Sequence, residues 1–268
     1  MEKKKKETAI VYSQKEIANG IFDMWIETAL AQNAHPGQFI SIYPKNEATL
    51  LPRPISICEV DEKKEKLRIV YRIAGTGTKE FSKYKKGDSI SILGILGNGF
   101  PLEAADGKTV FLMGGGIGIP PMVQLAKELA DANQKAGRDN SNIKIILGYR
   151  NELFLQEDLE KYGQVYIATE DGSRGSRGTV MNAIEDNCLK GDVIFSCGPM
   201  PMLRAIKEYA AENGMAAYLS LEERMACGVG ACLGCVCKTK EVDQHSFVHN
   251  ARICTDGPVY PAEEVDIS

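Results

Sequence analysis

From residue 109 to residue 220 of this 268-residue chain, apolar stretches that suit buried strands alternate with amphipathic stretches that suit helices. The stretch TVFLMGGG is followed by PPMVQLAKELADANQ, and DVIFSCG is followed by PMPMLRAIKEYAAEN. Strands that alternate with helices form a parallel sheet covered by helices on both faces. The pattern therefore predicts a doubly wound α/β domain whose binding crevice lies at the carboxyl ends of the strands.

The residues before this region have a different rhythm. Between residues 8 and 96, short apolar stretches such as QFISIYP and LRIVYRI are separated by turns rich in Gly, Pro and Asp. This spacing predicts an antiparallel barrel or sandwich, with a short helix in TKEFSKY. In the middle region, a helix is also expected around ELFLQEDLEKY. We divide the chain into residues 1–104, 105–218 and 219–268.

Composition limits the class of protein. A hydrophobic fraction of 44% and a charged fraction of 25% are ordinary for a soluble globular protein, and a net charge of −4 gives no reason to expect a nucleic-acid partner. The one charge run, EKKKK at residues 2–6, is interpreted as a solvated, frayed terminus. No apolar run is long enough for a bilayer, so we expect a cytoplasmic protein with reduced thiols and no membrane contact.

The third part contains a cysteine cluster in RMACGVGACLGCVCKTK. Cys227, Cys232 and Cys235 have the spacing C-x4-C-x2-C, and Cys254 follows after eighteen further residues. This is the plant-type ferredoxin pattern of ligands to a [2Fe–2S] cluster. Structural zinc, which usually takes two tight cysteine pairs, and unliganded buried cysteines are the alternatives. Cys237 is a surplus thiol that is expected to have no role, although it could replace Cys235 as a ligand.

Two histidines lie in the same segment. His245 and His249 fall in the loop before Cys254 and are interpreted as exposed loop residues rather than cluster ligands.

Glycines follow two of the predicted parallel strands. Gly115, Gly116 and Gly118 stand between a strand and a helix that opens with proline, where backbone amides could bind a pyrophosphate. Cys197 ends a later strand and should open toward the same crevice, although an isolated cysteine is more often a small buried residue. The loop arginines Arg174 and Arg177 could reach phosphates or could simply be solvated.

The first part contains the stretch LPRPISI. Prolines on both sides of Arg53 indicate an edge strand or a bulge, and an arginine fixed there could pair with a phosphate. We expect Ser56 to face the same side as Arg53 and to hydrogen-bond the edge of a ring. Gly77 and Thr78, in RIAGTGTKEF, would supply a second anion cradle ahead of a short helix. An ordinary edge strand and turn are the alternative.

In this order, the motifs resemble the ferredoxin–NADP reductase superfamily over essentially the whole chain. There a Greek-key barrel with R-P-x-S binds FAD, and an α/β domain with G-G-G-x-G-x-x-P and C-G-P-x-x-M binds the nicotinamide nucleotide. The cysteine spacing and ICTDGPVY narrow the resemblance to the electron-transfer subunits of NAD-linked, class 1B dihydroorotate dehydrogenases.

This resemblance implies roles for individual residues. Cys197 and Ser56 would lie at the reacting rings, and the four cysteines would ligate the [2Fe–2S] cluster. The residues implied for FAD and the nicotinamide nucleotide are Arg53, Pro54, Ile55, Ser56, Val70, Tyr71, Arg72, Gly77, Thr78, Gly115, Gly116 and Gly118.

The resemblance also implies a partner, an FMN-containing catalytic subunit, in a heterotetramer with two copies of each chain. Electrons would pass from dihydroorotate to FMN, then to [2Fe–2S], FAD and NAD⁺, because a flavin exchanges both single electrons and pairs. The chain alone would not oxidise dihydroorotate. The small subunit of an NADH-dependent ferredoxin:NADP oxidoreductase or of a sulfhydrogenase is one alternative, and a zinc-stabilised interaction module is another. The arginines Arg150, Arg174 and Arg177 leave NAD and NADP both open.

Overall fold

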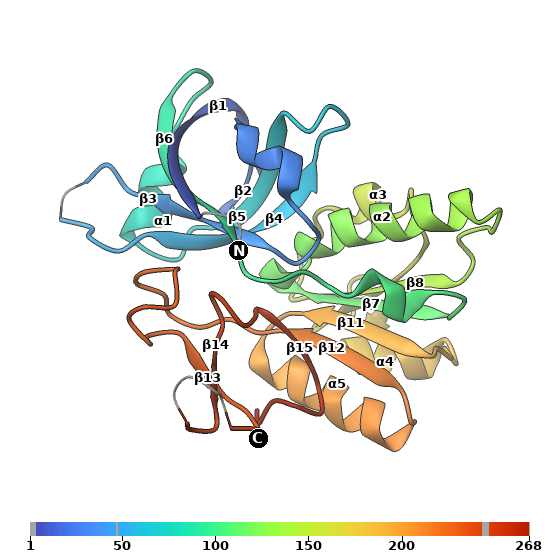
Figure 1. Cartoon of the computed structure of the whole chain (residues 1–268). Helices are drawn as coiled ribbons and strands as arrows, with labels where there is room; N and C mark the ends of the chain where they lie inside the picture. The colour runs from blue at the N-terminus through green and yellow to red at the C-terminus, as the bar shows by residue number, and fades with distance from the viewer. Residues whose placement is uncertain (1–3, 47, 243–246, 268) are drawn as a thin grey trace.

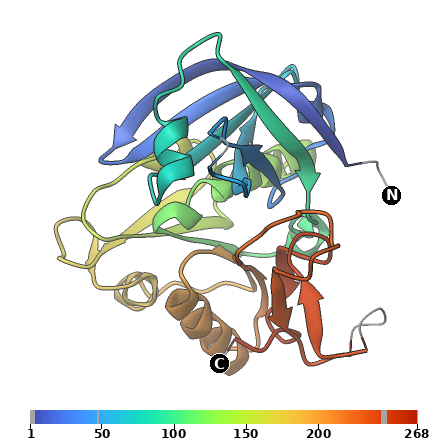
Figure 2. The same cartoon turned by 90° about the vertical axis from the view of Figure 1, so that its left-hand side faces the viewer.

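The computed structural model describes residues 4–46, 48–242 and 247–267, and contains a closed barrel, a sheet flanked by helices, and a loop-rich C-terminal segment (Figure 1). The C-terminal segment lies beside both the barrel and the sheet (Figure 2). The fold class predicted from the sequence is confirmed. Among the described residues, no helix has the length and apolar character needed to cross a membrane.

Six antiparallel strands close the barrel in the order β1–β2–β5–β4–β3–β6. They are β1 (Lys5–Ala18), β2 (Ile21–Glu27), β3 (Phe39–Tyr43), β4 (Arg53–Val60), β5 (Lys66–Arg72) and β6 (Ser89–Leu96). The consecutive strands β3, β4 and β5 pair with one another, and β5, rather than β3, lies beside β2. This arrangement is a Greek key. Alternate side chains, among them Ile40, Ile57 and Ile69, form the interior, and Phe81 of the short helix α1 (Thr76–Phe81) joins them.

The second domain is a sheet in the order β10–β9–β8–β7–β11–β12–β15. Its strands are β7 (Val110–Gly115), β8 (Ile143–Tyr149), β9 (Gln164–Thr169), β10 (Ser176–Arg177), β11 (Val193–Cys197), β12 (Ala216–Ser220) and β15 (Val259–Pro261). All neighbours are parallel except β12 and β15. The strand order reverses at β7, which has β8 on one side and β11 on the other, so the crevice is expected at this point.

Helices cover both faces of this sheet (Figure 1). They are α2 (Pro121–Lys135) and α3 (Gln156–Leu159) on the face toward the barrel, and α4 (Val180–Asp186) and α5 (Met200–Glu212) on the other. The helix expected around residues 152–162 is a single turn. Leu155 has a left-handed φ of 59°, and both Phe154 and Leu155 are buried, so the chain turns inward before any helix can start.

The remaining elements are short. They are the 3-10 turns η1 (Ala29–Asn33), η2 (Leu102–Ala105) and η3 (Gly116–Gly118), and the two-stranded sheet of β13 (Val236–Lys238) and β14 (Asn250–Arg252).

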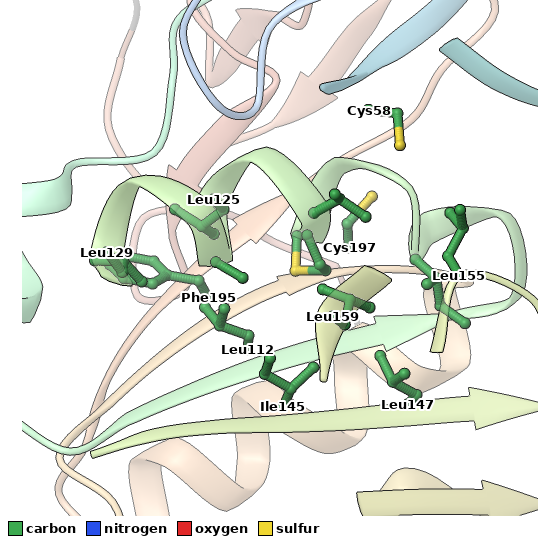
Figure 3. Packing of buried hydrophobic residues seen from close by; sticks show 14 of the residues in the cluster. Cys58, Leu112, Leu125, Leu129, Ile145, Leu147, Leu155, Leu159, Phe195 and Cys197 are labelled. Carbon is green, nitrogen blue, oxygen red and sulfur yellow. The ribbon is translucent and has the colours of Figure 1, made fainter. Parts of the chain in front are cut away.

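The barrel and the sheet share one hydrophobic core. Cys58 of β4 and Cys197 of β11 belong to the same cluster as Leu125 of α2 (Figure 3). The backbone N–H of Val60 also donates to Oε1 of the buried Gln124 at 2.8 Å. These contacts fix α2 against β4, so the two domains have one orientation.

Arg68 of β5 adds a buried charge network to this interface. Its guanidinium donates to both carboxylate oxygens of Asp23 at 3.0 Å and to Glu59 at 3.0 Å, and it reaches Asp158 of α3 at 3.3 Å. Only 3% of Asp23 is exposed. The network therefore joins three barrel strands to the second domain.

We expect Arg68→Leu to lower the free energy of unfolding by about 3–5 kcal/mol, because it leaves the Asp23 carboxylate buried without its main partner. Denaturant unfolding of the full chain measures this. Arg138→Leu is the matched control, since it breaks an exposed 2.8 Å pair with Asp106 and should cost less than about 1 kcal/mol. Equal effects of the two substitutions would contradict a special role for the buried network.

The cysteine segment packs on the outer face of the barrel. Phe39 of β3 and Leu96 of β6 belong to the same apolar cluster as Cys235 and Cys254. β15 then adds to the edge of the large sheet, next to β12. The segment is thus held by both domains and does not form a core of its own.

The lysine run near the N-terminus is part of this contact. Lys5 and Lys6 belong to β1, and the Lys6 ammonium lies 3.9 Å from the centre of the Tyr43 ring. The Lys4 ammonium donates to the carbonyl oxygens of Gly228 and Cys254, at 3.4 Å each. The interpretation of the run as a frayed terminus is therefore wrong for residues 4–6, because Lys5 and Lys6 belong to β1 and Lys4 joins the barrel to the cysteine segment.

Candidate functional site

The structure brings together the four cysteines of the predicted ligand set. The sulfur of Cys227 accepts from the N–H groups of Val229 and Cys232, and the sulfur of Cys232 accepts from the N–H of Gly234, all at 3.4 Å. The N–H of Ile253 donates to the carbonyl of Cys235 at 2.9 Å, which holds the Cys254 segment against the loop. Backbone amides directed at sulfur are the outer-shell donors that iron–sulfur sites use.

Within this group the thiols form two neighbouring pairs, Cys227 with Cys232 and Cys235 with Cys254. Burial raises the pKa of Cys227, but N–H donors, first that of Val229, outweigh burial and lower it to about 6. Burial, together with the Cys235 thiol, raises the pKa of Cys254 to about 12. We call the more exposed pair, Cys227 and Cys232, the outer pair, and the buried pair, Cys235 and Cys254, the inner pair. The lowered pKa of Cys227 favours its thiolate, whereas the raised pKa of Cys254 keeps that thiol neutral until a cation binds.

This donor set fits a two-iron cluster better than zinc. The four cysteines lie as two neighbouring pairs, Cys227 with Cys232 and Cys235 with Cys254. A structural zinc takes four ligands on one ion, whereas a [2Fe–2S] cluster shares its four cysteines between two irons. Gly228 and Gly230 have positive φ angles of 67° and 81°, which turn the loop around the site.

The other potential metal ligands of this segment, Cys237 and His249, contact groups other than the four cysteines. Cys237 is on β13, half-buried, beside the hydroxyl of Tyr260. Nδ1 of His249 lies 2.8 Å from the carbonyl oxygen of Lys240, and His245 lies outside the described residues.

At the end of the barrel, Arg53 lies against the turn that begins α1. A Cβ on Gly77 would lie 2.8 Å from the Arg53 Nε, so only glycine permits this contact. The guanidinium also donates to the carbonyl of Leu51 at 2.6 Å. The Thr78 hydroxyl accepts from the N–H groups of Ala74 and Gly75, which shapes the turn. Arg53 and the first amides of α1 thus lie side by side, and their binding of a phosphate remains a prediction.

The expectation that Ser56 faces the same side as Arg53 is wrong. The two residues are three positions apart, and side chains alternate along a strand. Ile55 and Ile57 pack in the barrel interior, whereas Cys58 packs toward the second domain. Ser56 shares the face of Cys58, so it points to the cleft between the domains.

The first half of β4 is open on one side, as the prolines predict. Residues 53–56 pair with β3, whereas pairing with β5 starts only at Ile57 and has an irregularity before Glu59. The backbone of Pro54 and Ile55 therefore has a side that no strand covers, where a planar ligand could lie.

Three consecutive residues of β5 differ in direction. Val70 packs in the cluster that the barrel shares with the sheet, and Arg72 lines the crevice of the second domain. Tyr71 points into the barrel, where its hydroxyl donates to Gln14 at 2.7 Å. Tyr71 therefore has only its main chain available for a ligand outside the barrel.

A crevice of about 770 Å³ lies at the carboxyl ends of the parallel strands, as predicted. Its lining includes Ile21, Arg72, Gly115, Gly116, Tyr149, Arg150, Glu170, Thr179, Pro199 and Met202. Residues of both the barrel and the sheet contribute, so a ligand bound here contacts both domains.

The three glycines of the second domain have different tasks. Gly116 has a φ of 53° and borders the crevice beside Arg72. A Cβ on Gly115 would lie 2.5 Å from the sulfur of Met202, and one on Gly118 would lie 2.3 Å from the carbonyl oxygen of Cys197. Gly118 is therefore required for packing against β11 and does not line the crevice.

Cys197 is the last residue of β11 and is 1% exposed, within the shared core (Figure 3). Burial raises the pKa of its thiol well above the usual value, so the thiol is neutral. This is the small buried residue that was the alternative at the sequence level. A direct contribution of Cys197 to the chemistry remains a prediction.

Glu170 lines the crevice but was not predicted as a site residue, whereas Arg72, predicted as a cofactor-binding residue, also lines it. Glu170 follows β9, and its carboxylate lies 3.7 Å from the Arg150 Nε. The signal that could have identified Glu170 is its position directly after a parallel strand. Arg174 and Arg177 do not line this crevice.

Comparisons with known proteins show which family the chain belongs to. Residues 222–266 match the family described as the iron-sulfur cluster binding domain of dihydroorotate dehydrogenase B, and residues 112–208 match the oxidoreductase NAD-binding domain. The electron transfer subunit of dihydroorotate dehydrogenase B (NAD(+)) from Bacillus cereus strain B4264 is 41% identical, over 97% of this chain and 98% of its own. The chain belongs to this family of electron transfer subunits. The corresponding subunit from Listeria innocua is 42% identical, over 96% of this chain and 97% of its own.

Solved structures of reductases share the fold of this chain. An NADH-dependent reduced ferredoxin-NADP oxidoreductase superposes with a TM-score of 0.81 at 27% identity, covering 96% of this chain and 89% of the other. A ferredoxin NADP⁺ reductase from Neisseria gonorrhoeae with bound FAD and NADP shows the same fold, with a TM-score of 0.62 at 18% identity, over 78% of this chain and 92% of the other.

Proposed function

We propose that this chain receives electrons from a catalytic dihydroorotate dehydrogenase subunit and delivers them to NAD⁺ in pyrimidine biosynthesis. The observation that carries the proposal is the convergence of Cys227, Cys232, Cys235 and Cys254 on the outer face of the barrel. The identity of 41% over nearly the whole chain supports it. As a family member the chain is an oxidoreductase component that uses [2Fe–2S], FAD and NAD.

In this proposal the barrel binds FAD, the α/β domain binds NAD and the cysteine segment binds the [2Fe–2S] cluster. Arg53, Gly77 and the first amides of α1 bind the FAD pyrophosphate, and Ser56 with the backbone of residues 54–55 faces the ring. When bound, FAD exchanges electron pairs with nicotinamide and single electrons with an iron–sulfur cluster. The chain's own residues orient the groups and exclude water between the two domains.

The crevice residues suit NAD better than NADP. Glu170 places a carboxylate at the rim, where it could accept from the hydroxyls of a ribose. The same carboxylate would repel a 2′-phosphate, and it partly neutralises Arg150. We propose that Arg72 and the amides near Gly116 meet the pyrophosphate of NAD.

We propose that the partner docks over the outer cysteine pair. Cys232 is exposed, and the neighbouring Val229 and Leu233 are 43% and 55% exposed. Exposed apolar residues around a cluster ligand suit contact with another chain. The partner would hold FMN, and the assembly would contain two copies of each chain. All eight cysteines lie in described residues and are free thiols, which supports a cytoplasmic location.

Co-purification with the catalytic subunit tests this function. We expect the isolated chain to oxidise NADH with an artificial acceptor and to leave dihydroorotate unchanged. Addition of the catalytic subunit should give reduction of NAD⁺ by dihydroorotate. Oxidation of dihydroorotate by the isolated chain, or no NAD⁺ reduction by the reconstituted pair, would contradict the proposal.

The fold similarity to an NADH-dependent reduced ferredoxin-NADP oxidoreductase favours a second candidate, a reductase subunit that exchanges electrons with a ferredoxin. Such a subunit would reduce ferredoxin with NADH and give no dihydroorotate activity with any partner. The higher identity to the dihydroorotate dehydrogenase relatives makes this the second choice.

A further inference from the structure

Three buried side-chain hydroxyls in the described residues have no hydrogen-bond partner: Ser41 Oγ, Thr255 Oγ1 and Tyr260 OH. Buried polar atoms of native proteins are almost always paired, because an unpaired one costs about 1–3 kcal/mol. An orphaned hydroxyl therefore indicates a missing partner. All three hydroxyls lie at the cysteine segment.

Ser41 approaches the cysteine loop from the barrel. It is fully buried on β3, and like Phe39 two residues earlier it points outward, toward the apolar cluster that contains Cys235 and Cys254. A Cβ on Gly228, the residue after Cys227, would lie 3.6 Å from the Ser41 Oγ. The serine hydroxyl thus faces the start of the loop that carries the outer cysteine pair.

Thr255 approaches the same loop from the opposite segment. It follows Cys254, and a Cβ on Gly230 would lie 3.3 Å from its Oγ1. The Gly230 N–H lies near the Cys254 thiol and lowers its pKa, although burial outweighs this effect. The Asp256 carboxylate, which Arg252 binds at 3.0 and 3.1 Å, is also close to this hydroxyl. The threonine hydroxyl therefore lies among groups that surround the proposed cluster.

Tyr260 has a different neighbour. Its hydroxyl lies beside the thiol of Cys237, which is outside the predicted ligand set. We therefore assign it no role toward the cluster.

We propose that the Ser41 and Thr255 hydroxyls donate hydrogen bonds to the sulfur atoms of the [2Fe–2S] site and thereby raise its reduction potential. Reduction adds one negative charge, and a donor stabilises the more negative state more strongly. The two hydroxyls come from different parts of the chain, Ser41 from β3 of the barrel and Thr255 from the segment that follows Cys254. This inference rests on the proposed function, since it requires the cluster.

The test is an EPR-monitored redox titration of the FAD- and iron-loaded full chain. Ser41→Ala and Thr255→Val should each make one-electron reduction of the cluster about three- to tenfold less favourable, where tenfold corresponds to 59 mV. Thr255→Ser keeps a hydroxyl and should restore the original midpoint. The FAD midpoint should not move in any of these variants.

Ser196→Ala is the matched control, because it removes a buried hydroxyl that is paired with the Met113 carbonyl at 3.1 Å within the sheet. It should leave the cluster midpoint unchanged. If Thr255→Val does not bind iron, the reduction midpoint of the cluster in Ser41→Ala tests the proposal in its place. Unchanged midpoints in Ser41→Ala and in every iron-loaded Thr255 variant would overturn this proposal alone, whereas absence of a cluster from the wild-type chain would overturn the proposed function.

Discussion

Cys227→Ser is expected to abolish electron transfer from the catalytic partner to NAD⁺, by more than about 100-fold, while FAD remains bound. Changes in outer-shell groups of metal sites cost about 10- to 100-fold, and loss of a ligand should cost more. The iron content should fall in parallel. Iron analysis, the flavin absorbance and the coupled dihydroorotate–NAD⁺ assay measure the three quantities. NADH oxidation with an artificial acceptor should continue, because it needs only the flavin and the crevice.

Cys237→Ser is the matched control for this substitution. The two cysteines are ten residues apart in the same segment, but Cys237 lies on β13 away from the outer pair. It should retain iron and coupled activity. If Cys237→Ser lost the cluster and Cys235→Ser kept it, Cys237 would be the third ligand and our assignment would be wrong at that position.

Arg53→Gln is expected to weaken FAD binding about 100-fold. The guanidinium is held against Gly77 by close packing and by its bond to the Leu51 carbonyl, so it is already oriented for a pyrophosphate. A hydrogen bond to a charged group contributes about 1.5–3 kcal/mol, and 2.8 kcal/mol is roughly 100-fold. Titration of the flavin-free chain with FAD measures the dissociation constant.

Two further variants separate this role from a structural one. Arg53→Lys keeps the charge but not the planar fork, so its FAD affinity should lie between those of the wild type and Arg53→Gln. Arg138→Gln removes an exposed arginine and should leave FAD affinity unchanged. If Arg53→Gln bound FAD as tightly as the wild type, the pyrophosphate would have to lie elsewhere.

The fold could be predicted where the sequence has a strong period. Long amphipathic stretches such as residues 121–135 gave helices of the expected type, because one apolar face packs on the sheet. Residues 152–162 did not, since the burial of Phe154 and Leu155 outweighed their helical spacing. The addition of β15 to the large sheet is a long-range contact that no local pattern contains.

The candidate site could also be predicted only in part, because local spacing can be read from the sequence and long-range packing cannot. The cysteine spacing identified four side chains that the fold brings together, because ligand spacing in a loop is a local property. The direction of Tyr71 into the barrel and the place of Arg72 in the crevice depend on packing between domains. The role of Lys4 at the cysteine segment was missed because charge runs at a terminus usually have no fixed contacts.

The most direct test is a reductive titration of the anaerobically purified full chain with dithionite. Flavin absorbance and the EPR signal of the cluster are measured at each step of the titration. We predict uptake of about three electron equivalents per chain, a pair by the flavin and a single one by the cluster. Uptake of only a pair, with no cluster signal and no acid-labile sulfide, would contradict the central claim that both groups belong to this chain.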